Sequence, residues 1–282
     1  MELNKFIFRT LSDFNGNIGF YFKDLQDGKI IDINANKVFA AASVIKIPLA
    51  LKMSALVADG KYSLQDKIVI KKQNKVGGTG IIQNLNNEYV PTVGELITLA
   101  ISLSDNIATN ELVDLVGGVD AVNEYCRSKG LVKTSMQRKM MDFEARKAGK
   151  DNYITAAEIG LLLEDICKIS YADTNVEKAI IMPVFKGMVM QQCRNKIPAK
   201  IPAADYYDLG HNYLPPEGEV MVANKTGDLW STQNDAAICV LPNGEKYILS
   251  ICTDELQSGY EGIEVIADLS RNVYEYMKLK YE

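Results

Sequence analysis

The sequence has little of what builds metal sites, disulfide frameworks or membrane spans. It contains 1 histidine, His211, and 5 cysteines, which are scattered, odd in number and never form a C-x-x-C pair. A zinc site or disulfide framework is therefore not expected, and buried free thiols suit the cysteines better. No apolar run reaches the roughly 18 residues that a membrane-spanning helix needs, so no membrane span is expected. No cofactor is expected either.

The charge balance excludes another class of partner. The net charge is -5, and no patch rich in lysine or arginine interrupts the chain. A nucleic-acid partner is therefore not expected. Hydrophobic residues make up 47% and charged residues 24%, which is ordinary for a globular protein. The first residues lack the apolar segment of a signal peptide, so we expect a cytoplasmic protein, or a secreted or periplasmic one whose leader has been removed.

One stretch combines a serine and a lysine inside an apolar run. Residues 41–53 begin with small side chains and continue almost without polar breaks, which predicts a buried helix. Lys46 follows Ser43 by three residues, so on a helix the two side chains share a face. A desolvated lysine can take the proton of a serine hydroxyl and so make it a nucleophile. The alternative is a chance pairing at the edge of a core helix.

Two further motifs follow in the chain. Ser104-Asp105-Asn106 comes after an apolar segment, and Lys225-Thr226-Gly227 comes after a strand-like one. Alone, the first is typical of an ordinary loop with local hydrogen bonds from its aspartate and asparagine. Together, Ser-Lys, Ser-Asp-Asn and Lys-Thr-Gly in this order form the motif set of class A β-lactamases and penicillin-binding proteins. The sequence resembles a class A β-lactamase-related serine hydrolase from about Phe20 to its C-terminal helix.

The resemblance implies an acylation machinery. Ser43 would be the nucleophile that attacks the carbonyl carbon of a β-lactam or an acyl-D-alanyl peptide. The backbone N–H groups of Ser43 and Asp228 would form the oxyanion hole, and Gly227 would let the substrate lie against its strand. The Asp228 side chain departs from the pattern, because a carboxylate there repels an anionic substrate.

The lysines and the second serine have implied roles as well. Lys46 would accept the Ser43 proton, which requires burial and nearby positive charge to lower its pKa. Lys225 would supply that charge and, with Thr226, bind the substrate carboxylate. Ser104 would relay a proton to the leaving nitrogen.

The remaining members of the Ser-Asp-Asn motif have separate tasks. Asn106 would hold the substrate amide, whereas Asp105 would hold its own loop. The partner is therefore expected to be a small-molecule substrate, and the oligomeric state is left open.

The base that would activate water for deacylation is the main departure from the family. If Arg138 takes the place of the family's loop arginine, the position of the catalytic glutamate falls on Met140, which cannot act as a base. Asp142 or Glu144 could serve only if the loop follows a different path. Glu144 is retained as the candidate, with a solvated loop charge as the alternative.

Strand patterns at both ends of the chain enclose a mainly helical middle. The expected fold is therefore α/β (α+β): an antiparallel sheet built from both chain ends and flanked by terminal helices, plus a helical insert. This is also the arrangement of the resembled family. The predicted division is residues 1–58 and 203–282 for the sheet domain and residues 59–202 for the all-α domain.

Three further features have lesser or open roles. Gly77-Gly78-Thr79-Gly80 is either an ordinary turn or an edge of the substrate site. Trp230 either walls the site or packs in the core, and His211 is a surface residue rather than a catalyst. The predicted function is a β-lactamase-type serine hydrolase. The alternatives are a D,D-peptidase or esterase on the same scaffold, or a sensor domain that stays acylated.

Overall fold

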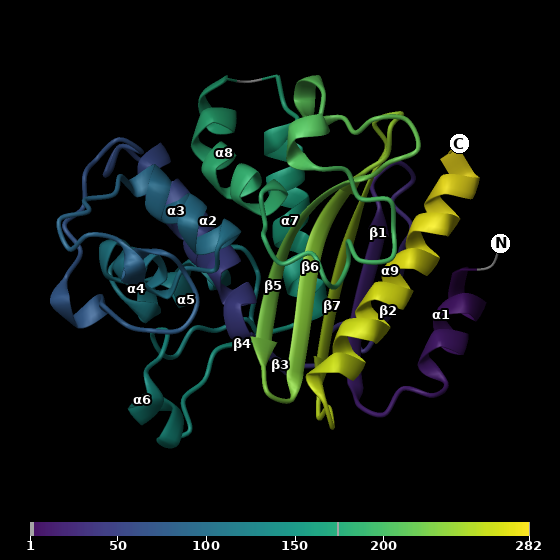
Figure 1. Cartoon of the computed structure of the whole chain (residues 1–282), viewed down its shortest axis with the longest axis horizontal. Coiled ribbons are helices and arrows are strands. Elements are labelled where there is room, and N and C mark those ends of the chain that lie inside the picture. Colours follow the sequence, from purple (N-terminus) through teal and green to yellow (C-terminus); the bar gives the residue numbers. More distant parts are fainter. Residues whose placement is uncertain (1–2, 174, 282) are drawn as a thin grey trace. The chain divides into compact units, whose positions relative to one another are not determined.

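The chain folds into two compact units. The computed structural model describes residues 3–173 and 175–281. Unit 1 comprises residues 1–44, 155–165 and 193–282, and unit 2 comprises residues 45–154 and 166–192. Within the described ranges, no helix is long and apolar enough to cross a membrane. Figure 1 shows the elements of both units.

Unit 1 is built on a five-stranded antiparallel sheet with the order β2-β1-β7-β6-β5. The strands come from both ends of the chain, as expected: β1 Asn17–Asp24, β2 Ile30–Ile33, β5 Met221–Leu229, β6 Thr232–Val240 and β7 Lys246–Asp254. Tight turns join β1 to β2 and β6 to β7, with Gly28 and Gly244 at positive φ. Strand β5 lies at one edge of the sheet.

The two terminal helices cover one face of this sheet. They are α1 Leu3–Leu11 and α9 Gly259–Tyr281, and they lie side by side (Figure 1). Apolar side chains at helical spacing, such as Leu269, Val273 and Met277, pack in one core with Phe20 and Leu249 of the sheet. Burial of this apolar surface is the main stabilising contribution to unit 1.

The first part of α7 (Ala156–Ser170) also belongs to unit 1. At Gly160 the helix approaches Tyr21 of β1 so closely that an added Cβ atom would lie 2.4 Å from the tyrosine ring. The Thr155 hydroxyl accepts a hydrogen bond from the Glu158 N–H group and so caps the helix. The short strand β3 Phe39–Ala40 lies in this unit too.

Unit 2 is mainly helical. Its helices are α2 Lys46–Ala58, α3 Val93–Ser102, α4 Asn106–Val116, α5 Val119–Ser128, α6 Phe143–Lys147 and α8 Asn175–Val189. It also contains the end of α7, the two-residue strand β4 Tyr153–Ile154, and the 3-10 turns η2 Lys72–Asn74 and η3 Ile82–Asn84. A capping box between Thr92 and Glu95 begins α3, and Gly117 at positive φ ends α4.

The boundaries of the units differ from the predicted division at residues 58/59 and 202/203. Helix α2 lies in unit 2, because it is apolar around its circumference and packs against α3, α4, α5 and α8 of the same unit. Residues 155–165 and 193–202 lie in unit 1 rather than in the helical unit. The predicted antiparallel sheet from both chain ends, with terminal helices and a helical insert, is confirmed.

Candidate active site

Ser43 lies in the 3-10 turn η1, Ala42–Ile45, which runs directly into α2. The boundary between the units falls between Val44 and Ile45, so Ser43 belongs to unit 1 and Lys46 to unit 2. Ala42 has a φ of 46°, which is unfavourable for a residue with a Cβ atom. Strained backbone of this kind is concentrated at functional sites, so it supports a functional reading of this turn.

The Lys-Thr-Gly motif lies on the edge strand β5, and its glycine packs closely against the serine segment. A Cβ atom added at Gly227 would lie 2.8 Å from the Ala41 carbonyl oxygen and 3.1 Å from the Ser43 nitrogen. Only glycine allows this approach. The side-chain amide of Asn234 on β6 donates to the carbonyl oxygens of Ala40 and Ala41 at 2.9 and 3.2 Å and so fixes the same segment.

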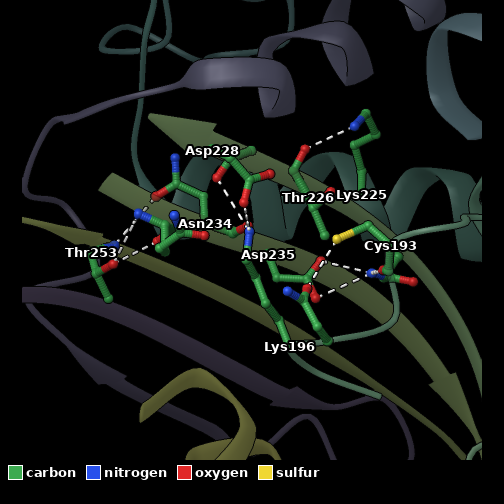
Figure 2. Close-up of polar contacts among 12 residues, drawn as sticks. Cys193, Lys196, Lys225, Thr226, Asp228, Asn234, Asp235 and Thr253 are labelled. Carbon is green, nitrogen blue, oxygen red and sulfur yellow. Dashed lines mark hydrogen bonds and ion pairs between the residues drawn. The ribbon is translucent and has the colours of Figure 1, made fainter. Parts of the chain in front are cut away.

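Lys225 is fully buried, and its Nζ atom donates to the Thr226 carbonyl oxygen at 2.8 Å (Figure 2). Burial lowers the pKa of this amine to about 8, against the opposing effect of the Asp228 carboxylate; the positive charge of Lys196 lowers it further. Lys225 can therefore change its charge near neutral pH.

The side chain of Asp228, which the sequence left without a role, forms an ion pair. Its Oδ1 atom lies 2.7 Å from the Nζ atom of Lys196 (Figure 2). The Lys196 side chain is 0% exposed, whereas that of Asp228 is 52% exposed. Lys196 also donates to the Asn234 carbonyl oxygen at 3.2 Å. The pair therefore joins a buried cation to a carboxylate at the surface.

A second carboxylate, Asp235, lies buried beside these lysines. It accepts hydrogen bonds from the Ile197 N–H group at 3.0 Å and from the Asn224 side-chain amide at 3.0 Å. Burial raises its pKa, although Lys196 opposes the shift. Lys196, Lys225, Asp228 and Asp235 are called the unit 1 cluster below.

In unit 2 the structure brings together the other predicted residues. The Nζ atom of Lys46 donates to the Ser104 carbonyl oxygen at 2.6 Å, to the Ser104 hydroxyl at 3.1 Å and to the Asn106 side-chain oxygen at 3.0 Å. These acceptors match the three donors of an ammonium group. Lys46 is fully buried, and Ser104 has a φ of 53°. Lys46, Ser104 and Asn106 are called the unit 2 cluster.

The Ser-Asp-Asn loop is held by the aspartate and by the glycine-rich segment. One oxygen of Asp105 accepts from the N–H groups of residues 107 and 108, and the other accepts from those of residues 81 and 82. A Cβ atom at Gly80 would lie 2.3 Å from the Asp105 carboxylate. The Thr79 hydroxyl donates to the Ser104 carbonyl oxygen at 2.7 Å. The glycine-rich segment therefore supports this loop directly.

The loop that carries the predicted position of the deacylation base is also anchored within unit 2. Arg138 and Asp151 form a nearly buried ion pair, with 2.7 Å between Nη2 and Oδ1. The Asn110 side chain bonds the backbone of Met140 twice, donating to its carbonyl at 3.2 Å and accepting from its N–H group at 2.8 Å. These two bonds fix the backbone of Met140, which is 8% exposed. Its side chain cannot act as the base, because a thioether does not accept a proton from water.

The two nearby carboxylates have other partners. Asp142 caps α6 by accepting from the Ala145 N–H group at 2.9 Å. The Glu144 side chain is 84% exposed and pairs with Lys147 at 2.8 Å. This is the environment of a solvated surface charge, and the role of Glu144 as the base stays a prediction.

Three lesser expectations have clear outcomes. Trp230 is 91% exposed in the turn between β5 and β6, so the core-packing interpretation was wrong. His211 lies exposed in the 3-10 turn η5, His211–Tyr213. All five cysteines are free thiols, and four of them are buried, as predicted.

Sequence reasoning missed Lys196 and Asn234. Lys196 lies in a segment that the sequence presents only as irregular and proline-rich. The polar run Thr232-Gln233-Asn234-Asp235 within a strand was the available signal for Asn234, because a central strand of a covered sheet is normally apolar.

A family model described as the beta-lactamase enzyme family matches residues 2–277. The chain belongs to the beta-lactamase enzyme family. Its motif set is that of class A enzymes, whose members are serine hydrolases.

Individual relatives of this beta-lactamase family chain are distant. Beta-lactamase VEB-1 of Pseudomonas aeruginosa is 23% identical over 278 residues, which covers 93% of this chain and 86% of the relative. The extended-spectrum beta-lactamase PER-1 of the same organism is 25% identical over 258 residues, covering 86% of this chain and 77% of that protein.

Superposition on solved structures shows that the chain has the class A beta-lactamase fold. A beta-lactamase from Sphaerobacter thermophilus DSM 20745 superposes with a TM-score of 0.80 at 26% identity, over 98% of this chain and 97% of that one. PBP-A superposes with a TM-score of 0.82 at 23% identity, over 99% and 96% of the two chains.

Proposed function

We propose that this beta-lactamase family chain is a serine hydrolase that is acylated at Ser43 by β-lactams or related amides and esters and releases the acyl group slowly. The observation that carries the proposal is the buried amine of Lys46, bound to the hydroxyl of Ser104 and the side-chain oxygen of Asn106. A buried lysine bonded to a serine hydroxyl suits proton transfer.

Acylation forms one bond and breaks another. The Ser43 Oγ atom bonds to the substrate carbonyl carbon, and the bond from that carbon to the leaving nitrogen or oxygen breaks. Lys46 in its neutral form accepts the proton of the Ser43 hydroxyl, and a proton reaches the leaving atom through Ser104, which returns Lys46 to the neutral form. Asn106 would hold the substrate amide.

Backbone donors would stabilise the negative charge that develops on the carbonyl oxygen. The close approach of Gly227 to the Ser43 nitrogen supports the assignment of the Ser43 and Asp228 N–H groups to this role. One such donor is worth about 3–4 kcal/mol of the barrier. Lys225 and Thr226 would contact the substrate beside the scissile bond.

Slow release follows from the loop at Met140. The side chain held there by Asn110 cannot take a proton from water, and Asp142 and Glu144 are engaged elsewhere. The L158E mutant of PBP-A has a similar fold, and its structure is that of an acyl-enzyme complex with penicillin-G. This supports an acyl intermediate as the central species of the reaction.

The test is to incubate the protein with a chromogenic cephalosporin and follow both colour and intact mass. Slow turnover with a persistent adduct supports the proposal. Rapid turnover without an adduct would show that an efficient deacylation base exists. A stoichiometric adduct with no turnover would favour the sensor alternative, and cleavage of small esters alone would favour the esterase.

Glu144 can be tested separately. If its carboxylate serves as the base, Glu144→Gln slows deacylation far more than acylation. Since this side chain is exposed and paired with Lys147, we expect both rates to stay unchanged.

A further inference from the structure

The unit 1 cluster contains its own carboxylate at the end of the Lys-Thr-Gly motif. Asp228 follows Gly227 directly on β5, and its Oδ1 atom lies 2.7 Å from the buried Nζ atom of Lys196 (Figure 2). About half of the Asp228 side chain is exposed, so its negative charge lies at the protein surface. The sequence alone gives no reason for an acid here.

The cluster holds two lysines and two carboxylates. Lys196 and Lys225 are fully buried, and a lysine that is charged in such a place needs an anion or several hydrogen bonds to offset its lost hydration. Asp235 is buried among the Ile197 N–H group and the Asn224 amide and so cannot meet a substrate. Asp228 is the exposed anion of the four.

The carboxylate of an incoming substrate would therefore meet lysines that already have carboxylates of the chain beside them, and the negative charge of Asp228 would lie next to it. Two carboxylates a few ångströms apart repel each other, and the repulsion is stronger near a protein surface than in bulk water. A neutral acyl ester or amide meets no such repulsion.

We propose that Asp228, held by Lys196 directly after the Lys-Thr-Gly motif, places a carboxylate of the chain itself beside the substrate-contacting residues Lys225 and Thr226, so that the preferred substrates are acyl esters or amides with no carboxylate beside the scissile bond. This inference rests on the proposed acyl chemistry at Ser43 and narrows its substrate class.

The test uses two thioesters with the same acyl group, one releasing mercaptoacetate and the other its methyl ester. Reaction is followed by loss of the thioester absorbance, and each kcat/KM is divided by the hydroxide-catalysed rate of the same compound. For the unaltered protein the neutral thioester is expected to be preferred at least about tenfold, a difference of about 1.4 kcal/mol. An equal rate or a preference for the anion overturns the inference.

Asp228→Asn keeps the shape and an acceptor for Lys196 while removing the charge. We expect the preference for the neutral thioester to fall about tenfold or to reverse. Asp268→Asn is the matched control, because Asp268 is also a half-exposed carboxylate in unit 1 paired with a lysine, at 2.6 Å from Lys200. An Asp228→Asn ratio that stays with the control would contradict the inference.

A binding measurement separates this inference from the proposed function. Benzoate binding, followed by ligand-observed NMR, requires no acylation of Ser43. We expect Asp228→Asn to bind benzoate at least about tenfold more tightly than the unaltered protein and the control. Equal binding, or no binding by any of the three, overturns the inference. Absence of any acyl adduct alongside tighter binding would overturn the proposed function alone.

Discussion

The Nζ atom of Lys46 lies 3.1 Å from the hydroxyl oxygen of Ser104 and 2.6 Å from the carbonyl oxygen of the same residue. One side chain thus bonds both the backbone and the side chain of a residue 58 positions further along the chain. Ser104 has a positive φ, and Asp105 and the glycine-rich segment support the loop that holds it in this conformation. The contact between Lys46 and Ser104 therefore depends on that loop.

Replacement of Lys46 tests the proton transfer. Lys46→Met keeps most of the side-chain volume but removes the amine, and we expect acylation to slow by about 10²–10⁴-fold. The measurement is the rate of adduct formation by intact mass, with thermal unfolding to check that the variant folds. Lys52→Met, on the same helix α2, is the control and should leave the rate within about twofold. Equal rates for both variants would remove Lys46 from the reaction.

Met140→Glu should create the missing base. The Asn110 side chain fixes the backbone of residue 140, which is the position of the family's glutamate if Arg138 takes the place of the family's loop arginine. We expect deacylation to accelerate about tenfold or more while acylation stays unchanged. Burial of a carboxylate at this nearly buried position should lower the melting temperature.

Met140→Gln is the matched control for that variant, since it has the same shape without the acid. Release of the acyl group should stay as slow as in the unaltered protein. If the glutamine variant matched the glutamate variant, the change would come from loop packing and not from base catalysis.

The Arg138–Asp151 ion pair should stabilise the loop that holds Met140. Both side chains are mostly buried, and the Arg138 fork donates through Nε and Nη2 to one carboxylate oxygen. Asp151→Asn is therefore expected to lower the free energy of unfolding by about 1–3 kcal/mol in denaturant titrations. Glu144→Gln breaks the exposed pair with Lys147 and should have no measurable effect. Similar losses for both would show that burial does not distinguish the pairs.

Lys225 should make stability depend on pH in the alkaline range. Its folded-state pKa is about 8, below its unfolded value near 10.4, because burial disfavours the charged form. Between these values the unfolded chain binds more protons, so the free energy of unfolding should rise with pH, by about 3 kcal/mol at most. Denaturant titrations from pH 7 to pH 10.5 measure it. In Lys225→Met this rise should vanish; an identical slope in both proteins would contradict the assignment.

Most of the fold and site features that could be predicted came from short sequence patterns. The strands, the terminal helices and the three sequence motifs each occupy a short stretch whose periodicity or residue spacing is visible in the sequence. The Asp228–Lys196 pair could not be predicted in this way, because its partners lie 32 positions apart and Lys196 belongs to no recognisable pattern. A pairing of this kind depends on tertiary structure.

The boundaries between the units were also beyond the sequence pattern. No change in amino-acid composition separates α2 from the sheet segments before it. Helix α2 is nevertheless apolar on all sides, and it buries these side chains against other helices of unit 2. Likewise, Trp230 is a large apolar residue that a two-residue turn leaves exposed.

The most direct test of the account is to locate the adduct. The protein is incubated with penicillin G and, separately, with its methyl ester, then digested, and the peptides are analysed by mass spectrometry alongside Ser43→Ala. We predict one penicilloyl group on the peptide that contains Ser43 and none in the alanine variant. An adduct on another residue, or an equal adduct in Ser43→Ala, would contradict the central claim that Ser43 is the nucleophile.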